Sequence, residues 1–246
     1  MSVTVILNGY KRPHALKEQY DAVVNQSYKD INVMFWGNYD SDSFDKFPTE
    51  VLTKCTTAFC NQNLGVWARF AFALNATTQY VCMLDDDTMP GKKWIEHCLD
   101  TIKSTNGLIG GRGVKMIGDD YPNYPGCKYE GVGRGNDKIK RVDIIGHSWF
   151  FEKDWLRFYW LDMPSIPFLY GGEDMHFSFV LQRRLGLFSY IPPQPENDPD
   201  LWASTNPSKY GEDMAATSRT SAGHIQANAY WNYMLSQDYK LAKDSE

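Results

Sequence analysis

The stretch Tyr80-Val81-Cys82-Met83-Leu84-Asp85-Asp86-Asp87-Thr88-Met89-Pro90 runs from five mostly apolar residues into three consecutive carboxylates. A short apolar run closed by turn residues predicts a buried strand at the centre of a parallel sheet. Ligands of open α/β sheets bind beyond the carboxyl ends of the strands, which is where this acidic triplet would lie. Mg²⁺ and Mn²⁺ prefer oxygen ligands and often share carboxylates with a substrate's phosphates. The triplet therefore indicates a metal site; the alternative is a solvated acidic turn that caps the next helix.

The composition narrows the class of protein. The chain has 246 residues, of which 43% are hydrophobic, enough for one large or two small α/β domains. A formal net charge of −5 without a long basic tract argues against a nucleic-acid partner. No apolar run approaches the ~18 residues that span a bilayer, and the N-terminus lacks the marks of a signal peptide. Five cysteines without zinc-ligand spacing indicate reduced thiols, so we expect a cytoplasmic protein.

Strands and helices alternate through the first half of the chain. We expect strands at 3–7, 31–36, 56–60 and 80–84, and helices at 13–25, 66–75 and 94–105. This alternation predicts a parallel sheet with right-handed crossovers. Asn8, Asn38, Asn63 and the acidic triplet each follow a strand, which favours one nucleotide-sized crevice. The turn after the first strand has no G-x-G-x-x-G, so a dinucleotide site is not expected.

Two further features point to the same crevice. Arg69 falls outside the apolar stripe of its helix, where it can hold a phosphate or one of the triplet carboxylates; a surface arginine is the alternative. Gly171-Gly172-Glu173-Asp174 opens a helix expected at 173–185. Acidic residues in a first turn are favoured by the helix dipole, so capping is the simpler role. The glycine pair, however, permits close approach of the backbone to a ligand.

The rest of the second half is less regular. We expect strands from 108, at 140–145 and at 187–191, a flexible loop or hairpin up to about 137, a short helix at 154–160, and a C-terminal helix from 223.

These residues in this order resemble the nucleotide-sugar glycosyltransferases of the GT-A type. The features are a first strand ending in Asn8-Gly9-Tyr10, then Asn63-Leu64-Gly65 with Arg69, the triplet, and the Gly171–Asp174 motif. The resemblance implies a single α/β domain of the GT-A (Rossmann-like) fold, with a mostly parallel central sheet flanked by helices and a small antiparallel acceptor-side part. Residues 1–115 would bind the nucleotide sugar, 116–191 would hold the acceptor and catalytic groups, and 192–246 would form an irregular segment and a helix.

The resemblance also implies roles for single residues. The residues implied for the nucleotide and donor sugar are Asn8, Gly9, Arg12, Asn38, Asn63, Arg69, Asp85, Asp86, His147 and Trp149. Asp85, Asp87 and the late His224 would bind Mn²⁺ or Mg²⁺, with His176 as a competing candidate. Asp174 would be the catalytic base and Glu173 its neighbour on the acceptor. For His147 a core position is an equal alternative.

A narrower resemblance covers 172–202, which is similar to glycosyltransferase domains of large algal (chlorella) viruses that act on capsid glycans. It implies a host-cytoplasm location.

The resulting hypothesis is a metal-dependent hexosyl- or deoxyhexosyltransferase that moves a sugar from a nucleoside-diphosphate donor, UDP being the commoner base, to a glycan or glycoprotein acceptor. A sugar nucleotidyltransferase is an alternative, although residues 8–13 hold a single glycine where such enzymes carry a Gly-rich loop. A non-catalytic glycan-binding domain is the other, because Phe, Trp and Tyr make up 15% of the chain. The competing explanation for those rings is a large aromatic core.

Overall fold

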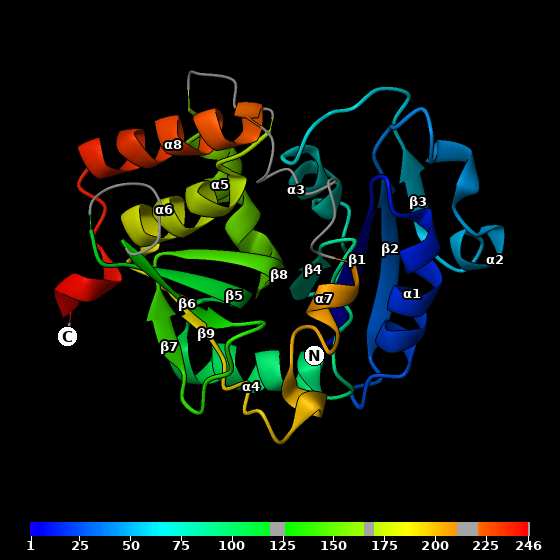
Figure 1. Ribbon diagram of the computed structural model, residues 1–246, viewed down its shortest axis with the longest axis horizontal. Helices are drawn as coiled ribbons and strands as arrows, with labels where there is room; N and C mark the ends of the chain where they lie inside the picture. Colours follow the sequence, from blue (N-terminus) through cyan, green and yellow to red (C-terminus); the bar gives the residue numbers. More distant parts are fainter. Residues whose placement is uncertain (119–125, 165–169, 211–220, 246) are drawn as a thin grey trace.

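A computed structural model describes residues 1–118, 126–164, 170–210 and 221–245. They form a nine-stranded mixed sheet in the order β3-β2-β1-β4-β8-β5-β9-β7, with β6 paired to β5. Figure 1 shows the sheet flanked by helices, and the predicted single α/β domain is confirmed. The strands are β1 (Val3–Gly9), β2 (Ile31–Gly37), β3 (Thr56–Phe59), β4 (Tyr80–Leu84), β5 (Leu108–Met116), β6 (Cys127–Gly131), β7 (Lys140–Val142), β8 (Ile144–Glu152) and β9 (Ser189–Ile191).

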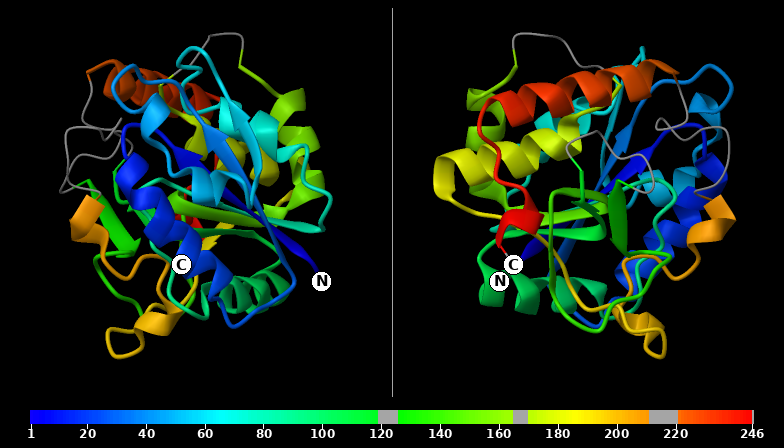
Figure 2. Two further views of the ribbon diagram at one scale, coloured as in Figure 1. Left: turned by 90° about the vertical axis from the view of Figure 1, so that its right-hand side faces the viewer. Right: turned by 60° about the vertical axis from the view of Figure 1, so that its left-hand side comes forward.

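The helices cover both faces of this sheet (Figure 2). They are α1 (Leu16–Val24), α2 (Thr49–Leu52), α3 (Ala68–Ala73), α4 (Trp94–Thr105), α5 (Leu156–Leu161), α6 (Glu173–Leu185), α7 (Pro207–Tyr210) and α8 (Ser221–Ser236). None of the helices in the described ranges is both long and apolar enough to cross a bilayer.

The N-terminal half of the sheet is parallel, as its hydrophobic pattern predicts. β1 lies between β2 and β4 and is buried along its whole length, as is β4. Strands buried on both faces read as continuous apolar runs, which is why the sequence predicts them well. Their carboxyl ends meet at one edge, so Asn8 and the acidic triplet come together there.

The C-terminal half is built around β8, which runs antiparallel to both β4 and β5. The expected strand at 140–145 is wrong in its bounds, because the chain breaks at Asp143 between β7 and β8. The side chain of Asp143 is fully buried and accepts hydrogen bonds from the backbone amides of Met116 (2.7 Å) and Ala242 (2.7 Å). A buried carboxylate that is committed to these amides interrupts the strand, and β8 then continues to Glu152.

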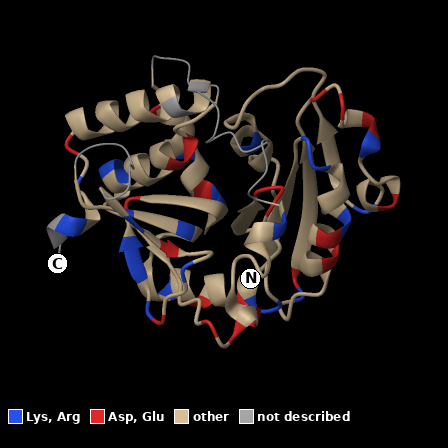
Figure 3. Ribbon diagram, in the orientation of Figure 1, with Lys and Arg blue, Asp and Glu red and all other residues tan. Residues whose placement is uncertain are grey.

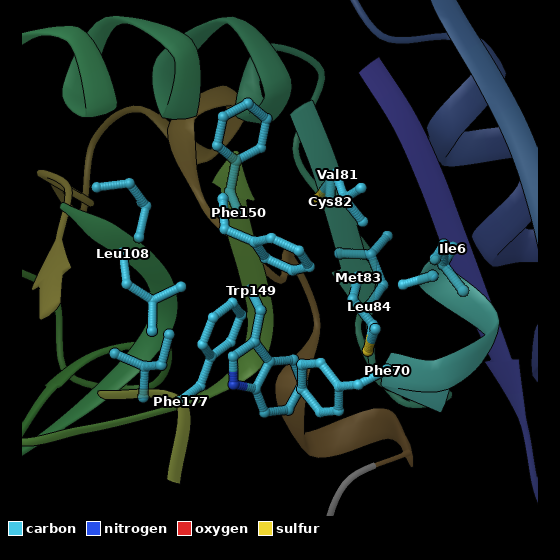
Figure 4. Packing of buried hydrophobic residues seen from close by; sticks show 14 of the residues in the cluster. Ile6, Phe70, Val81, Cys82, Met83, Leu84, Leu108, Trp149, Phe150 and Phe177 are labelled. Atoms are coloured by element: carbon cyan, nitrogen blue, oxygen red, sulfur yellow. The ribbon is translucent and has the colours of Figure 1, made fainter. Parts of the chain in front are cut away.

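Many of the aromatic residues form the core between β8 and the helices. Phe70 stacks on Tyr159 with ring centroids 4.7 Å apart and meets Trp149 and Phe177 edge to face. Figure 4 shows Phe70, Trp149 and Phe177 gathered below β4 and β8. Edge-to-face and offset-stacked rings at these distances add stability beyond their buried area. An aromatic core therefore explains these rings without a glycan ligand.

The segment that follows β9 returns to the carboxyl end of β4. Backbone hydrogen bonds join Gly91 N to Trp202 O (2.8 Å), Lys93 N to Asp200 O (2.8 Å) and Thr205 N to Met89 O (2.8 Å). These bonds fix α7 next to the turn that follows the acidic triplet.

Candidate active site

The turn after β4 is held rigidly by its neighbours. The Asp85 amide donates to the His147 carbonyl (3.0 Å), and the Thr88 amide closes the turn onto the Asp85 carbonyl (3.0 Å). The buried side chain of Gln19 in α1 donates to the carbonyls of both Asp85 (2.6 Å) and Thr88 (2.8 Å). The backbone of the triplet is therefore fixed from β8 and α1, and its carboxylates are preorganised. Figure 3 shows the acidic residues at this end of β4, between the two halves of the sheet.

Asp86 points toward the loop after β1. Its carboxylate forms an ion pair with the buried Arg12 and accepts a hydrogen bond from the Tyr10 amide (3.2 Å). Burial raises the pKa of Asp86 to about 7, the Arg12 charge opposes that rise, and the neighbouring Asp85 and Asp87 add to it. The charge of Arg12 therefore favours the ionised form of Asp86 and limits the rise of its pKa.

Asp87 lies between His147 and Arg12. One carboxylate oxygen lies 3.7 Å from His147 Nδ1, and the other lies 3.8 Å from Arg12. Burial and then the repulsion of Asp85 raise the pKa of Asp87. His147 adopts a left-handed backbone conformation (φ 63°), which is uncommon for a residue other than glycine and clusters at functional sites. Its Nδ1 is buried and has no hydrogen-bond partner among the described residues.

A divalent cation fits this set of oxygen donors. Asp85 and Asp87 are carboxylates that repel each other, and a Mg²⁺ or Mn²⁺ ion would relieve that repulsion. In the described parts of the chain, no three His, Cys, Asp or Glu side chains gather as a complete protein-only shell.

Arg69 joins the triplet to the helix that carries the candidate base. It forms an ion pair with Asp85 and a second one with Glu173 at 3.0 Å, and it is 8% exposed. Its guanidinium lies over the ring of Trp149, 4.4 Å from the ring centroid. Arginine suits this position because its planar fork can bind two carboxylates and stack on an indole at once. A surface position for Arg69 is therefore wrong.

Glu173 and Asp174 begin α6 beside this arginine. Gly172 precedes them in a left-handed conformation (φ 89°), and a Cβ atom there would lie 2.9 Å from the Cβ of Tyr230. Glycine is therefore required by both the backbone and the packing against α8. Glu173 is buried, and burial raises its pKa against the charge of Arg69.

Asp174 is half-buried, and its carboxylate accepts a hydrogen bond from the Met175 amide at 2.7 Å. Burial, followed by the charge of Glu173, raises the pKa of Asp174 to about 8. A carboxylate with a pKa near the working pH is suited to general base catalysis.

The asparagines at the strand ends mainly brace the loops. Asn8 donates to the Leu84 carbonyl (2.6 Å), and its Oδ1 is buried without a hydrogen-bond partner among the described residues. Asn38 donates to Asn63 (2.9 Å), which in turn donates to the hydroxyl of Tyr10 (3.1 Å). The structure thus brings these predicted residues to one edge of the sheet. Of these three asparagines, Asn8 is the one whose side chain keeps a polar atom without a partner among the described residues.

Gly9 is fixed by packing rather than by a ligand, because a Cβ atom there would lie 2.5 Å from the ring of Phe35 and 2.7 Å from that of Phe47. Trp149, which the resemblance implies for the donor site, is 2% exposed and packs against the guanidinium of Arg69.

The two candidate metal histidines differ. His176 is fully buried and uses both ring nitrogens, with Tyr230 Oη at 2.5 Å and the Tyr159 carbonyl at 2.7 Å. Burial lowers its pKa to about 4, so it is a neutral core histidine and not a metal ligand. His224 lies in the first turn of α8, but its side chain is outside the described residues.

Sequence reasoning missed Tyr10 and Gln19. Tyr10 follows Asn8 and Gly9 directly, so its place at the strand end was a usable signal. Gln19 lies inside α1 and reaches the triplet across 66 residues of chain, for which the sequence carries no local mark.

Comparisons with known proteins identify the family and the fold of this chain. Residues 4–160 match the family described as Glycosyl transferase family 2. The fold is similar to that of S. aureus TarS, with a TM-score of 0.54 and 14% identity over 79% of this chain and 37% of that chain. The structure of S. aureus TarS 1–349 gives a TM-score of 0.54, and its complex with UDP gives 0.52, each with 14% identity over 78% of this chain and 60% of that chain. A search of curated proteins finds no match.

This chain thus spans less than two thirds of the TarS chains, and at this identity the likeness concerns the fold. The family match covers more than half of the chain and includes β1 from its second residue, β4, Arg69 and the triplet. The chain belongs to glycosyltransferase family 2 and has the GT-A fold.

Proposed function

We propose that this chain is a metal-dependent glycosyltransferase that transfers a sugar from a UDP-sugar to a glycan or glycoprotein acceptor. The observation that carries the proposal is one connected set of charges, in which Arg69 joins Asp85 of the triplet to Glu173, next to Asp174. A donor site and a base must lie close together in this reaction, and Arg69 links the two. The UDP complex of TarS supports the choice of nucleotide.

On the donor side, Asp85 and Asp87 would hold Mn²⁺ or Mg²⁺. Such an ion, when bound, neutralises the charge that develops on a diphosphate leaving group. Arg12 keeps Asp86 paired and away from the ion, since it contacts that carboxylate more closely than it contacts Asp87. His147 lies beside Asp87, and its Nδ1 has no hydrogen-bond partner among the described residues, which suits a contact with the donor sugar or phosphate.

On the acceptor side, Asp174 is the group that would take the proton of the attacking hydroxyl. Its partial exposure lets a substrate reach it, and its raised pKa makes it a stronger base than an ordinary aspartate. This role requires inversion at the anomeric carbon. If the product instead retains the donor's configuration, Asp174 would position the acceptor.

The proposal also includes the more specific expectations from the sequence, on the donor sugar, the location, the relatives and a further metal ligand. A hexosyl or deoxyhexosyl donor, a cytoplasmic location and a relation to algal-virus enzymes rest on the resemblance of single motifs and on composition. His224 as a further metal ligand rests on the same resemblance.

The test is release of UDP from a panel of UDP-sugars, measured with and without Mn²⁺. We expect Mn²⁺-dependent release, slow with water and faster with acceptor, and a loss of about 100-fold or more in Asp87→Asn. Asp137→Asn, an exposed aspartate outside the site, is the control. Pyrophosphate release from a nucleoside triphosphate would instead favour a nucleotidyltransferase. Glycan binding that is independent of metal and unchanged in Asp87→Asn would favour a binding domain.

A further inference from the structure

A cavity of about 610 Å³ lies beside the turn that follows the triplet, between the loop at 131–135 and the segment at 194–207. This volume is within the range of roughly 300–1,000 Å³ that is usual for small-molecule sites. Figure 2 shows these two segments, green and yellow to orange, running together below the sheet. The antiparallel bridge between Asn136 and Gln194 confirms that they are neighbours.

The loop presents backbone to the cavity. Gly131, Gly133 and Gly135 all have left-handed φ angles of 82°, 77° and 58°. The amides of Arg134 (2.8 Å) and Gly135 (3.1 Å) both donate to the Gly131 carbonyl, which closes the loop tightly. A Cβ atom at Gly133 would meet nothing within 4 Å, so open space lies directly against the backbone there. Bulkier residues would fill this space and could not adopt the conformation without strain.

The opposite wall is rigid and carries an aromatic ring. Trp202 is half-buried, and its indole N–H donates to the Pro195 carbonyl at 2.7 Å, which fixes the ring. Buried Gln194 ties this wall to β5 by donating to the Gly111 carbonyl (2.7 Å), and it accepts a hydrogen bond from the Ala203 amide (3.0 Å). An aromatic residue held in this way is a preorganised surface for a ligand.

The charges of the cavity favour a neutral polar ligand. Arg134 and Glu196 both line it and are exposed, and they contribute opposite charges. A diphosphate would be repelled by Glu196, whereas a sugar ring can donate hydroxyls to the carboxylate and accept from the guanidinium. Its apolar face can also pack on an indole. The lining therefore matches a saccharide better than a nucleotide.

The cavity is joined to the active site through Ser204, which lines it. Ser204 Oγ accepts a hydrogen bond from the Met89 amide (3.2 Å), two residues after Asp87. The wall at 194–207 lies outside the residues that match the family, 4–160, whereas the loop at 131–135 lies within them. We infer that this cavity is a subsite for a saccharide unit of the acceptor, an inference that rests on the proposed function.

The experiment uses saturation-transfer NMR on the full chain with a panel of methyl glycosides of glucose, galactose, mannose, N-acetylglucosamine, xylose, rhamnose and fucose. UDP and Mn²⁺ are present at saturation, so that the donor site is occupied. We expect at least one glycoside to bind. Its Kd should rise about tenfold or more in Arg134→Ala/Glu196→Ala, because hydrogen bonds to charged groups are among the stronger ones. Trp202→Leu should have a similar effect.

The matched control is Asp137→Ala/Lys138→Ala, an exposed pair of opposite charges next to the loop that does not line the cavity. This control should leave the glycoside Kd unchanged, and all variants should bind UDP as the wild type does. The inference is overturned if no glycoside binds to protein that is saturated with UDP, or if the Arg134/Glu196 variant binds the glycoside as the wild type does. A wild-type chain that binds no UDP would instead refute the proposed function.

Discussion

Replacing Arg69 by methionine removes a buried cation that the structure places between Asp85 and Glu173. Methionine keeps much of the side-chain volume, so the main loss is charge. Removing one partner of a buried ion pair costs about 3–5 kcal/mol, because the other charge is left buried and unpaired. Glu173 is buried, whereas the Asp85 side chain is 29% exposed and partly hydrated, so the lower end of that range applies.

We therefore expect Arg69→Met to lower the free energy of unfolding by about 3 kcal/mol. For a domain of this size each kcal/mol corresponds to roughly 2–4 °C in Tm, so the expected loss is roughly 6–12 °C. Urea denaturation at constant pH gives the free energy, and differential scanning fluorimetry gives Tm. Arg183→Met, an exposed arginine on α6, is the control and should change stability by no more than about 0.5 kcal/mol.

The pH dependence of the stability loss in Arg69→Met shows whether the missing charge causes that loss. Burial raises the folded-state pKa of Glu173 above its unfolded value, so the folded protein binds the proton more tightly and gains stability as pH falls. Without Arg69 the pKa of Glu173 should rise further. The difference in free energy of unfolding between the wild type and Arg69→Met should therefore shrink as the pH falls from 8 to 5. Arg69→Met/Glu173→Gln should recover most of the loss at pH 8. A deficit that is independent of pH and not recovered by the double variant would refute the role of charge.

Three further predictions concern Asp174, Gly172 and Asp143. The activity should rise with pH through an inflection near 8, because Asp174, with its pKa of about 8, loses its proton there. In a pH–rate profile, Asp174→Asn should remove that inflection and lower kcat/KM about 10²–10⁴-fold. Gly172→Ala should lower the free energy of unfolding by about 1–3 kcal/mol, because Gly172 has a positive φ and contacts Tyr230. Gly146→Ala, with open space around it, is the control and should lower the free energy less in urea denaturation. Equal losses in the two variants would contradict the role of φ and packing at Gly172. Asp143→Ala leaves two buried amides without an acceptor and should cost about 2–4 kcal/mol, with faster hydrogen exchange at the C-terminus as the specific readout.

The parallel half of the sheet could be predicted because its signals are local. β1 and β4 are apolar runs closed by turn residues, and the triplet follows directly, so both the strands and the site edge were readable. β8 was misjudged because Asp143 is polar and its two partners, Met116 and Ala242, lie far away in the chain.

The sequence predicts that Arg69 can hold a carboxylate of the triplet, as it does with Asp85, but the other partners within the site could not be read from it for the same reason. Arg12 and Asp86 are 74 residues apart, and Arg69 and Glu173 are 104 residues apart. Composition and periodicity carry no information on such pairs. His176 shows the limit most clearly, since only the Tyr230 hydroxyl and the Tyr159 carbonyl reveal that it is a core residue.

The central claim is that Asp85 and Asp87 bind a divalent cation and, through it, a nucleoside diphosphate. Isothermal titration of UDP into the wild-type chain tests this directly, first with Mn²⁺ and then with EDTA. We predict binding with Mn²⁺, a loss of at least about tenfold in affinity with EDTA, and the same loss in Asp87→Asn even with Mn²⁺ present. UDP affinity that is equal with Mn²⁺, with EDTA and in Asp87→Asn would contradict the account.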